Sequence, residues 1–194
     1  MYLASVMDLY TRSIVGWKLA SRMTVDLVLA ALDNAYACKK PAEGLVHHSD
    51  RGAQYASEVY RARLQQYGME ASMSRKGNCY DNACIESFHS LLKKEMIYCT
   101  RFKTKVQAEQ EIFEYIEIFY NRKRIHGSLG YVSPARFETM YYQNSANLHE
   151  EVSTFLTEVQ ESINGEANGA NGQTRQMGKR GKWAEKKAAP LIWR

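Results

Sequence analysis

The stretch NCYDNACIESFHSLLKKE, residues 78–95, places an acidic side chain at the edge of an apolar helix face. Four apolar residues here and just beyond recur at i, i+3, i+7 and i+11, a spacing that aligns side chains along one face of a helix: Ile85, Phe88, Leu92 and Met96. We predict a helix that begins at Asp81 and buries this stripe. Glu86 then lies where the buried face meets solvent.

A second carboxylate precedes this helix in the sequence. The stretch LVHHSDRGAQY, residues 45–55, places Asp50 directly after a run that is typical of a buried strand. Ligand groups in open α/β sheets usually project at such strand ends. The 35 residues between Asp50 and Glu86 leave room for a helix, a strand and a loop that return the chain to the same place. We therefore predict that the two carboxylates meet and suit magnesium, and hence phosphoryl chemistry.

Each carboxylate also has an ordinary interpretation. An Asp in the sequence SDRG is often a turn or cap residue, and a Glu in the first turns of a helix often interacts only with the helix dipole and solvent. Lys93 follows Glu86 by seven residues, which places the two about 20° apart around a helix. A cation on that face suits a phosphate, although a solvated lysine is the alternative.

The rest of the first 143 residues predicts a mixed α/β layer architecture. Runs 2–7 and 13–19 are short and apolar, which predicts an antiparallel hairpin. Helices and strands then alternate: a helix after Thr24, a strand at 45–49, a helix at 57–67 and a strand at 69–74.

Two further helices follow the one that carries Glu86. Thr104 and Gln107 form a capping box ahead of one of them, and Ser133 with Pro134 starts the other. The first of these helices carries two apolar rows: Val106, Phe113, Ile116 and Tyr120, and Ile112, Tyr115 and Phe119.

The last fifty residues differ in composition, so we predict a core at 1–143 and an extension at 144–194. Residues 144–171 contain five acidic residues and no Lys or Arg. Residues 172–194 contain seven Lys or Arg and one acidic residue. This extension comprises a weakly amphipathic acidic helix, a Gly/Asn-rich linker and a basic tail.

The composition argues against a disordered chain and against a small disulfide-rich one. With 45% hydrophobic and 24% charged residues, the chain can form a packed core. The four cysteines form no C-x-x-C pair and no zinc-ligand spacing, which indicates reduced thiols. We find neither a leader peptide nor a membrane span and expect a cytoplasmic protein. The net charge of +5 is compatible with a polyanionic partner but decides little by itself.

Four motifs together resemble the catalytic core of bacterial insertion-sequence transposases related to retroviral integrases. They are HHSDRGAQY, NCYDNACIESF, Lys93 and YNRKRIHGSLGYVSPARF, and the resemblance covers residues 1 to about 140. It implies a ribonuclease H-like fold, a mixed sheet flanked by helices. It also implies two Asp and one Glu holding two magnesium ions, with manganese as a substitute. Asp50 would be the second Asp and Glu86 the closing Glu.

The resemblance further implies hydrolysis at the ends of a mobile element, followed by attack of the freed 3′-hydroxyl on target DNA without a covalent enzyme intermediate. The implied partners are element-end and target DNA and further copies of the chain, near the bacterial nucleoid. Lys93 would bind element ends, with Asn78 and Asn82 around the site. Arg122, Arg124 and His126 would touch the DNA backbone, with a solvated helix end as the alternative.

The chain departs from the family pattern at its first strand. The family's first Asp stands on a strand ahead of the one that begins here at Met1, so we expect that strand to be missing and the chain alone to be inactive. Asp8 is no substitute, because it lies in a turn that we place at the opposite edge of the sheet. The alternative function is a non-catalytic DNA-binding or interaction remnant.

Overall fold

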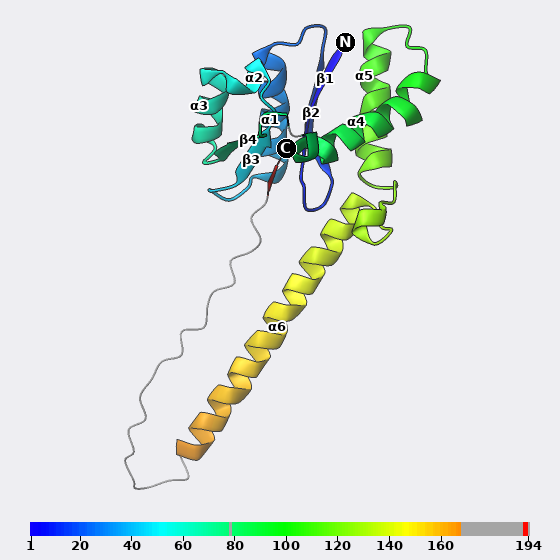
Figure 1. The fold of residues 1–194 in the computed structure, drawn as a ribbon. Coiled ribbons are helices and arrows are strands. Elements are labelled where there is room, and N and C mark those ends of the chain that lie inside the picture. Colours follow the sequence, from blue (N-terminus) through cyan, green and yellow to red (C-terminus); the bar gives the residue numbers. More distant parts are fainter. Residues whose placement is uncertain (78, 168–191, 194) are drawn as a thin grey trace. The chain divides into compact units, whose positions relative to one another are not determined.

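The computed structural model describes residues 1–77, 79–167 and 192–193. It divides into two compact units, Met1–Phe137 with Ala189–Arg194, and Glu138–Ala188. The first unit has the mixed α/β architecture predicted from the sequence (Figure 1).

The predicted hairpin is confirmed. Strand β1 (Tyr2–Met7) pairs antiparallel with β2 (Ile14–Ala20), with a bulge between Val6 and Met7. Because side chains alternate across a strand, each face of the hairpin enters a different hydrophobic cluster. Ala4 and Val6 enter one cluster, and Met7 enters the other.

Helix α1 (Val25–Lys39) packs on the face of the hairpin that carries Ala4 and Val6. Thr24 occupies the N-cap position as predicted, although its side chain makes no capping hydrogen bond. The helix approaches β2 closely at Gly16, where a Cβ would lie 2.4 Å from the Ala31 carbonyl oxygen. Glycine is therefore required here by contact rather than by backbone conformation.

The predicted strands after α1 also form. Strand β3 (Val46–Ser49) pairs parallel with β4 (Glu70–Met73). Between them lie α2 (Ala53–Ala56) and α3 (Glu58–Gln66), the latter capped by Ser57.

The sheet is divided in two. Strands β1 and β2 form one sheet, and a second sheet has the order β4-β3-β5, in which β5 (Ile192–Trp193) runs parallel to β3. Among the described residues, no strand hydrogen-bonds to both β1 and β3. Instead, α1 and the cluster around it pack the hairpin against the β3 sheet.

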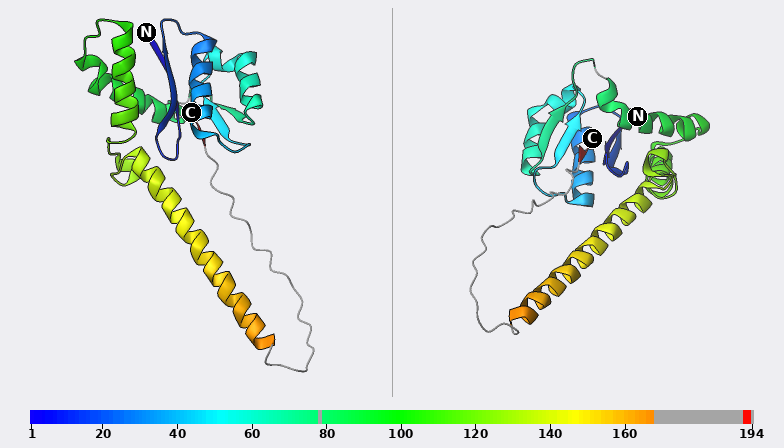
Figure 2. Two further views of the ribbon diagram at one scale, coloured as in Figure 1. Left: turned by 180° about the vertical axis from the view of Figure 1, so that it is seen from behind. Right: turned by 60° about the horizontal axis from the view of Figure 1, so that its bottom comes forward.

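Helices cover the other face of the hairpin (Figure 2). A short 3₁₀ turn, η1 (Cys79–Asn82), leads into α4 (Ala83–Glu95), which is followed by η2 (Ile97–Cys99). The predicted start at Asp81 is wrong, because Asp81 lies in η1, where it accepts hydrogen bonds from Arg75. The apolar stripe is confirmed, with Ile85 partly buried and three residues fully so: Phe88, Leu92 and Met96.

Helix α5 (Lys105–Phe113) continues into a π-helix, η3 (Glu114–Tyr120). The capping box forms: Thr104 Oγ1 accepts from the Gln107 N–H, and the Gln107 side chain accepts from the Lys103 N–H. The first predicted apolar row is only half right, because Val106 is 76% and Phe113 50% exposed whereas Ile116 and Tyr120 are buried. The wider turn of the π-helix changes which side chains face the core.

A short 3₁₀ turn, η4 (Gly127–Leu129), and a long helix, α6 (Pro134–Ala167), follow η3. Helix α6 starts where Ser133 and Pro134 predict it. It runs without a break through residues 143 and 144, the predicted boundary between the core and the extension. The helix reaches Ala167 and so includes the first four residues of the predicted linker, residues 164–167, which are therefore not a linker. The rest of the predicted linker and most of the basic tail lie outside the described residues. No helix within the described ranges is long and apolar enough to cross a membrane.

Candidate active site

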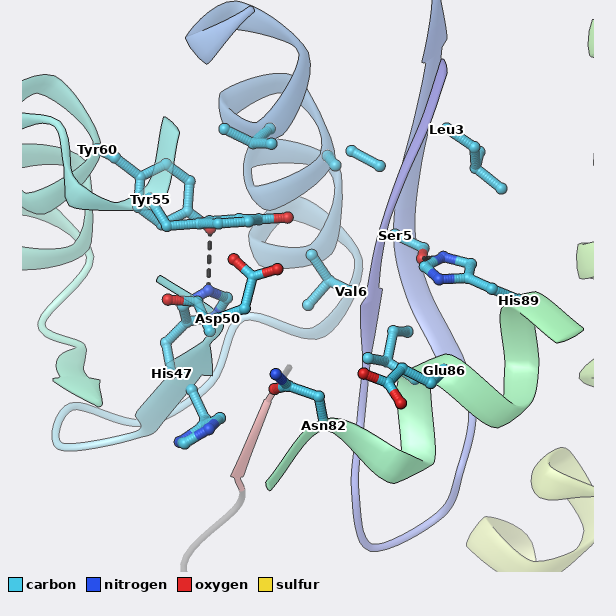
Figure 3. Close-up of a pocket in the computed structure, with 16 residues that line it drawn as sticks. Leu3, Ser5, Val6, His47, Asp50, Tyr55, Tyr60, Asn82, Glu86 and His89 are labelled. Carbon is cyan, nitrogen blue, oxygen red and sulfur yellow. Dashed lines mark hydrogen bonds between the residues drawn. The ribbon is translucent and has the colours of Figure 1, made fainter. Parts of the chain in front are cut away.

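A pocket of about 160 Å³ lies between strand β1, the end of β3 and the first turns of α4. Residues 3–6 of β1 form one wall, and residues 47–50 form another. Asp50 and Glu86 both line this pocket, and Figure 3 shows them entering it from different elements, with Asn82 beside them. The structure thus brings together the two carboxylates that the sequence singles out.

Asp50 is exposed, and its position is fixed by a local turn. Its Oδ1 accepts a hydrogen bond of 2.7 Å from the Gly52 N–H, and a Cβ at position 52 would lie 2.9 Å from the same oxygen. Tyr55 lines the pocket beside it, and burial followed by the Asp50 charge raises the pKa of Tyr55 to about 12. Asp50 is therefore a turn residue that also faces the cavity, next to a neutral phenol.

Glu86 is exposed in the first turn of α4, and two basic side chains follow it along the helix. His89 also lines the pocket, and its Nε2 lies 2.8 Å from the Ser5 hydroxyl oxygen. Burial, followed by the positive charge of Lys93, lowers the pKa of His89. Lys93 lines a second cavity of about 730 Å³, which His89 shares. His89 therefore lies between the cavity lined by Glu86 and the cavity lined by Lys93, and it lines both.

Of the two asparagines in this motif, Asn82 lies within the described residues and Asn78 does not. Asn82 lines the pocket, and its Oδ1 accepts a hydrogen bond of 2.9 Å from the Ser74 hydroxyl. Asn78 lies outside the described residues.

Arg122, Arg124 and His126 lie outside the carboxylate pocket. The Arg124 guanidinium forms an ion pair with Glu95, with Nη2 and Oε1 2.9 Å apart. Arg122 is exposed on the surface. His126 packs edge-on against Tyr120, its ring centroid 4.9 Å away, and burial lowers its pKa.

The motif that contains these basic residues also has a structural role. The Asn121 side chain is buried and pairs with the backbone of Ile14, accepting from its N–H and donating to its carbonyl, both at 2.9 Å. The backbone carbonyl of Asn121 accepts a hydrogen bond from the Ala135 N–H. Asn121 therefore ties the hairpin to the end of η3 and the start of α6.

Asp8 is a turn residue, as predicted. It is 3% exposed, and its carboxylate accepts hydrogen bonds from the Tyr10 N–H at 2.9 Å and the Thr11 hydroxyl at 2.7 Å. The pocket that contains Asp50 and Glu86 does not include it.

The donor set of the pocket fits a hard cation in part. Carboxylate oxygens suit Mg²⁺, which keeps several water ligands. Within residues 1–77, 79–167 and 192–193, however, no three His, Cys, Asp or Glu side chains are grouped so that they could hold a metal ion. Asp50 and Glu86 are therefore two carboxylates of the kind that Mg²⁺ prefers, without a third such group beside them among the described residues.

Three residues around the pocket escape prediction from the sequence. His89 differs from its helix neighbours only by its type. Tyr55 ends the motif HHSDRGAQY but nothing in the motif singles it out, and Ser74 lies in a segment without a distinctive motif. Their importance depends on contacts between strands and helices that periodicity does not reveal. A lone serine carries no signal of its own.

Comparison with known proteins identifies the family. A sequence model of the Integrase core domain matches residues 1–79, and a second model of the same description matches residues 86–142. The insertion element IS600 uncharacterized 31 kDa protein of Shigella sonnei is 49% identical over 146 residues, covering 75% of this chain and 54% of that protein.

Two named transposases are similarly close. The transposase for insertion sequence element IS904 of Lactococcus lactis is 49% identical over 138 residues, covering 71% of this chain and 54% of its own length. Transposase InsF for insertion sequence IS3A of Escherichia coli is 44% identical over 138 residues, covering 71% of this chain and 48% of its own length. The chain spans about half the length of these curated relatives.

A solved structure supports the fold. The cryo-EM structure of the simian T-cell lymphotropic virus intasome in complex with PP2A regulatory subunit B56 gamma contains a similar chain, with a TM-score of 0.51 and 16% identity. The match covers 64% of this chain and 43% of that one. This likeness shows the fold alone. The two family matches, which together span most of the chain, and the transposase relatives show that the chain belongs to the bacterial insertion-sequence transposases with an integrase-like core.

Proposed function

We propose that the chain is part of a transposase that cleaves the ends of a mobile DNA element and joins them to target DNA. The observation that carries the proposal is the pocket lined by both Asp50 and Glu86. The transposases IS904 and InsF, which share nearly half of the aligned residues, support the same activity.

Within this proposal, Asp50 and Glu86 are the ligands of a divalent cation, Mg²⁺ or Mn²⁺. Such an ion would polarise a phosphodiester and favour the deprotonated form of an attacking water or 3′-hydroxyl. Asp50 is held in place by the Gly52 N–H, and Glu86 by the helix that buries Phe88 and Leu92. The Asp50 carboxylate is therefore oriented before any ligand binds, and the backbone of Glu86 is fixed by its helix.

DNA is proposed to approach along the side of α4 that carries His89 and Lys93. Lys93 lines the larger cavity together with Lys103 and Lys105, so three cations surround an otherwise largely apolar floor. Phosphate contacts of this kind position DNA without reading its sequence. The element-end preference expected of Lys93 is part of this proposal.

A third oxygen ligand is proposed to come from outside the described residues, because these supply only two carboxylates to the site. A two-metal clamp needs a ligand that bridges both ions. The same observation favours the second candidate function, a DNA-binding protein that does not catalyse joining.

The test is transposition of the genomic element that encodes the chain, with its flanking DNA intact. Asp50→Asn and Glu86→Gln should each lower the transposition frequency at least about a hundredfold, because each change removes a metal-binding charge while keeping the side-chain shape. Glu58→Gln, an exposed change on α3, is the matched control and should leave the frequency unchanged.

Two results would contradict the proposal. Near-normal transposition of either variant would show that the substituted residue is not a ligand. A wild-type element that never transposes, although the purified chain binds DNA, would establish the non-catalytic alternative.

A further inference from the structure

Ser74 follows strand β4 and makes contacts on both sides of Asp50. It is 4% exposed. Its N–H donates to the Ser49 carbonyl at 2.9 Å, and its own carbonyl accepts from Arg51 Nε at 2.8 Å. The residues immediately before and after Asp50 are therefore both bonded to the Ser74 backbone.

The Ser74 hydroxyl connects this strand end to the start of α4. It lies 3.1 Å from His48 Nε2, 2.9 Å from Asn82 Oδ1 and 3.2 Å from the Ser49 carbonyl oxygen. Because a hydroxyl donates only one hydrogen, we assign it to Asn82, the nearer of the two acceptors. His48 Nδ1 lies in turn 2.9 Å from the Ser72 hydroxyl. One consistent assignment runs in a single direction, in which Ser72 donates to His48, His48 to Ser74 and Ser74 to Asn82.

Asn82 is placed so that this connection reaches Glu86. It is the residue directly before α4, and Glu86 follows it by four residues, which puts the two on neighbouring turns of one face. Both line the pocket with Asp50. Asn82 makes no capping hydrogen bond to its own helix, and its side-chain Oδ1 accepts instead from the Ser74 hydroxyl.

The loop between Ser74 and Asn82 is closed by a second contact. The Arg75 N–H donates to Asp81 Oδ2 at 3.0 Å, and the Arg75 guanidinium pairs with Asp81 Oδ1 at 3.1 Å. This pair is solvent-exposed on the arginine side, so it restrains the loop weakly. The buried Ser74 hydroxyl is the stronger restraint.

We propose that Ser74 is a positioning residue whose hydroxyl holds Asn82, and with it the first turn of α4, so that Glu86 stays beside Asp50. The residue touches neither a reacting group nor DNA. It acts through the chain of contacts from β3 to α4. Its effect on metal binding rests on the proposed function, whereas its effect on the start of α4 does not.

Hydrogen exchange on the full chain tests the structural part. Ser74→Ala should speed exchange at residues 79–86 about fivefold, the effect of losing one hydrogen bond worth about 1 kcal/mol. Asn82→Ala should do the same from the other end, and the double variant should match either single one. Ser74→Thr keeps the hydroxyl and should restore slow exchange, while Ser90→Ala, an exposed change on α4, is the control.

Titration with Mn²⁺ alone tests the link to the carboxylates. Ser74→Ala and Asn82→Ala should each weaken Mn²⁺ binding about fivefold without additivity. Unchanged exchange at residues 79–86 in Ser74→Ala, or effects that multiply in the double variant, would overturn the proposal. If the wild-type chain binds no Mn²⁺ while exchange responds as expected, the proposed metal site fails and the positioning role of Ser74 stands. Should Ser74→Ala fail to fold, the half-buried Asn82 still provides the comparison.

Discussion

Asp50 and Glu86 line a single pocket although one follows a strand of the β3 sheet and the other lies on a helix packed against the separate β1–β2 hairpin. Their proximity therefore depends on how two sheets and a helix pack together. Substitutions that change this packing should be distinguishable from those that remove a ligand.

Asp8→Asn should destabilise the fold rather than remove a ligand. The carboxylate accepts two hydrogen bonds inside the turn of the hairpin, and a neutral amide accepts them less well. We expect a loss of about 1–2 kcal/mol in the free energy of unfolding, measured by urea denaturation. Asp26→Asn, exposed in the first turn of α1, is the control. Undiminished stability combined with lost Mn²⁺ binding would show that Asp8 belongs to the metal site.

The buried His47 should make stability depend on pH. Burial, followed by the charge of His48, lowers the pKa of His47 to about 4 from 6.5. The unfolded chain then binds the proton more readily than the folded chain, so the contribution of His47 is complete above pH 6.5 and is lost as the pH falls towards 4. The loss is about 3 kcal/mol at most.

Urea denaturation at several pH values measures this effect. His47→Gln cannot take up a proton in this range, so its stability should change less between pH 6.5 and 4 than that of the wild type. Equal slopes for the two proteins would mean that His47 is not held neutral by the fold.

Gly16→Ala should be among the more damaging small substitutions. The new methyl group would meet the Ala31 carbonyl oxygen and the Ala35 nitrogen at 2.4 and 2.5 Å, so α1 would have to move away from β2. We expect a loss of about 1–3 kcal/mol. The control is Gly127→Ala, where the nearest atom lies 3.9 Å away. Thermal melting of both variants compares them, and similar melting temperatures would argue that the helix can shift without strain.

Lys93→Ala should reduce the dependence of DNA affinity on salt. Removing one phosphate contact lowers the slope of log affinity against log salt by about 0.9. Fluorescence anisotropy with a random duplex and an element-end duplex gives the slope, with Arg61→Ala on α3 as the control. If Lys93→Ala leaves both slopes unchanged, Lys93 does not contact phosphate.

Arg124→Ala should behave differently, because Arg124 is already paired with Glu95. The partly exposed ion pair is worth about 0.2–1 kcal/mol, so a small loss of stability should accompany this change. A drop in the salt slope as large as that of Lys93→Ala, with stability unchanged, would instead place Arg124 on the DNA.

The sequence predicted those parts of the fold that follow from local periodicity. The stripe of α4 and the hairpin both form, because each depends on side-chain spacing within one element. It failed at η3, where the change to a π-helix gives Val106 and Ile116 different environments. The start of α4 was also misplaced by two residues, because Asp81 lies in the preceding 3₁₀ turn, where it accepts hydrogen bonds from Arg75.

The candidate site was predictable only in its acidic residues. Asp50 and Glu86 could be chosen from their positions after a strand and on a helix edge, and the structure places both in one pocket. The contacts of Ser74 join three elements that are distant in sequence, so no pattern within a single element reveals them.

The division of the sheet has a mechanical consequence. A continuous ladder of backbone hydrogen bonds would fix the width of the pocket, whereas here its two walls belong to separate sheets joined through the side chains around α1. Packing contacts of this kind yield more readily than a ladder, so the hairpin and the β3 sheet can open as separate cooperative units. The gap between the carboxylates then depends on the stiffness of side-chain contacts, those of the apolar cluster around Leu32 and the one between Ser74 and Asn82.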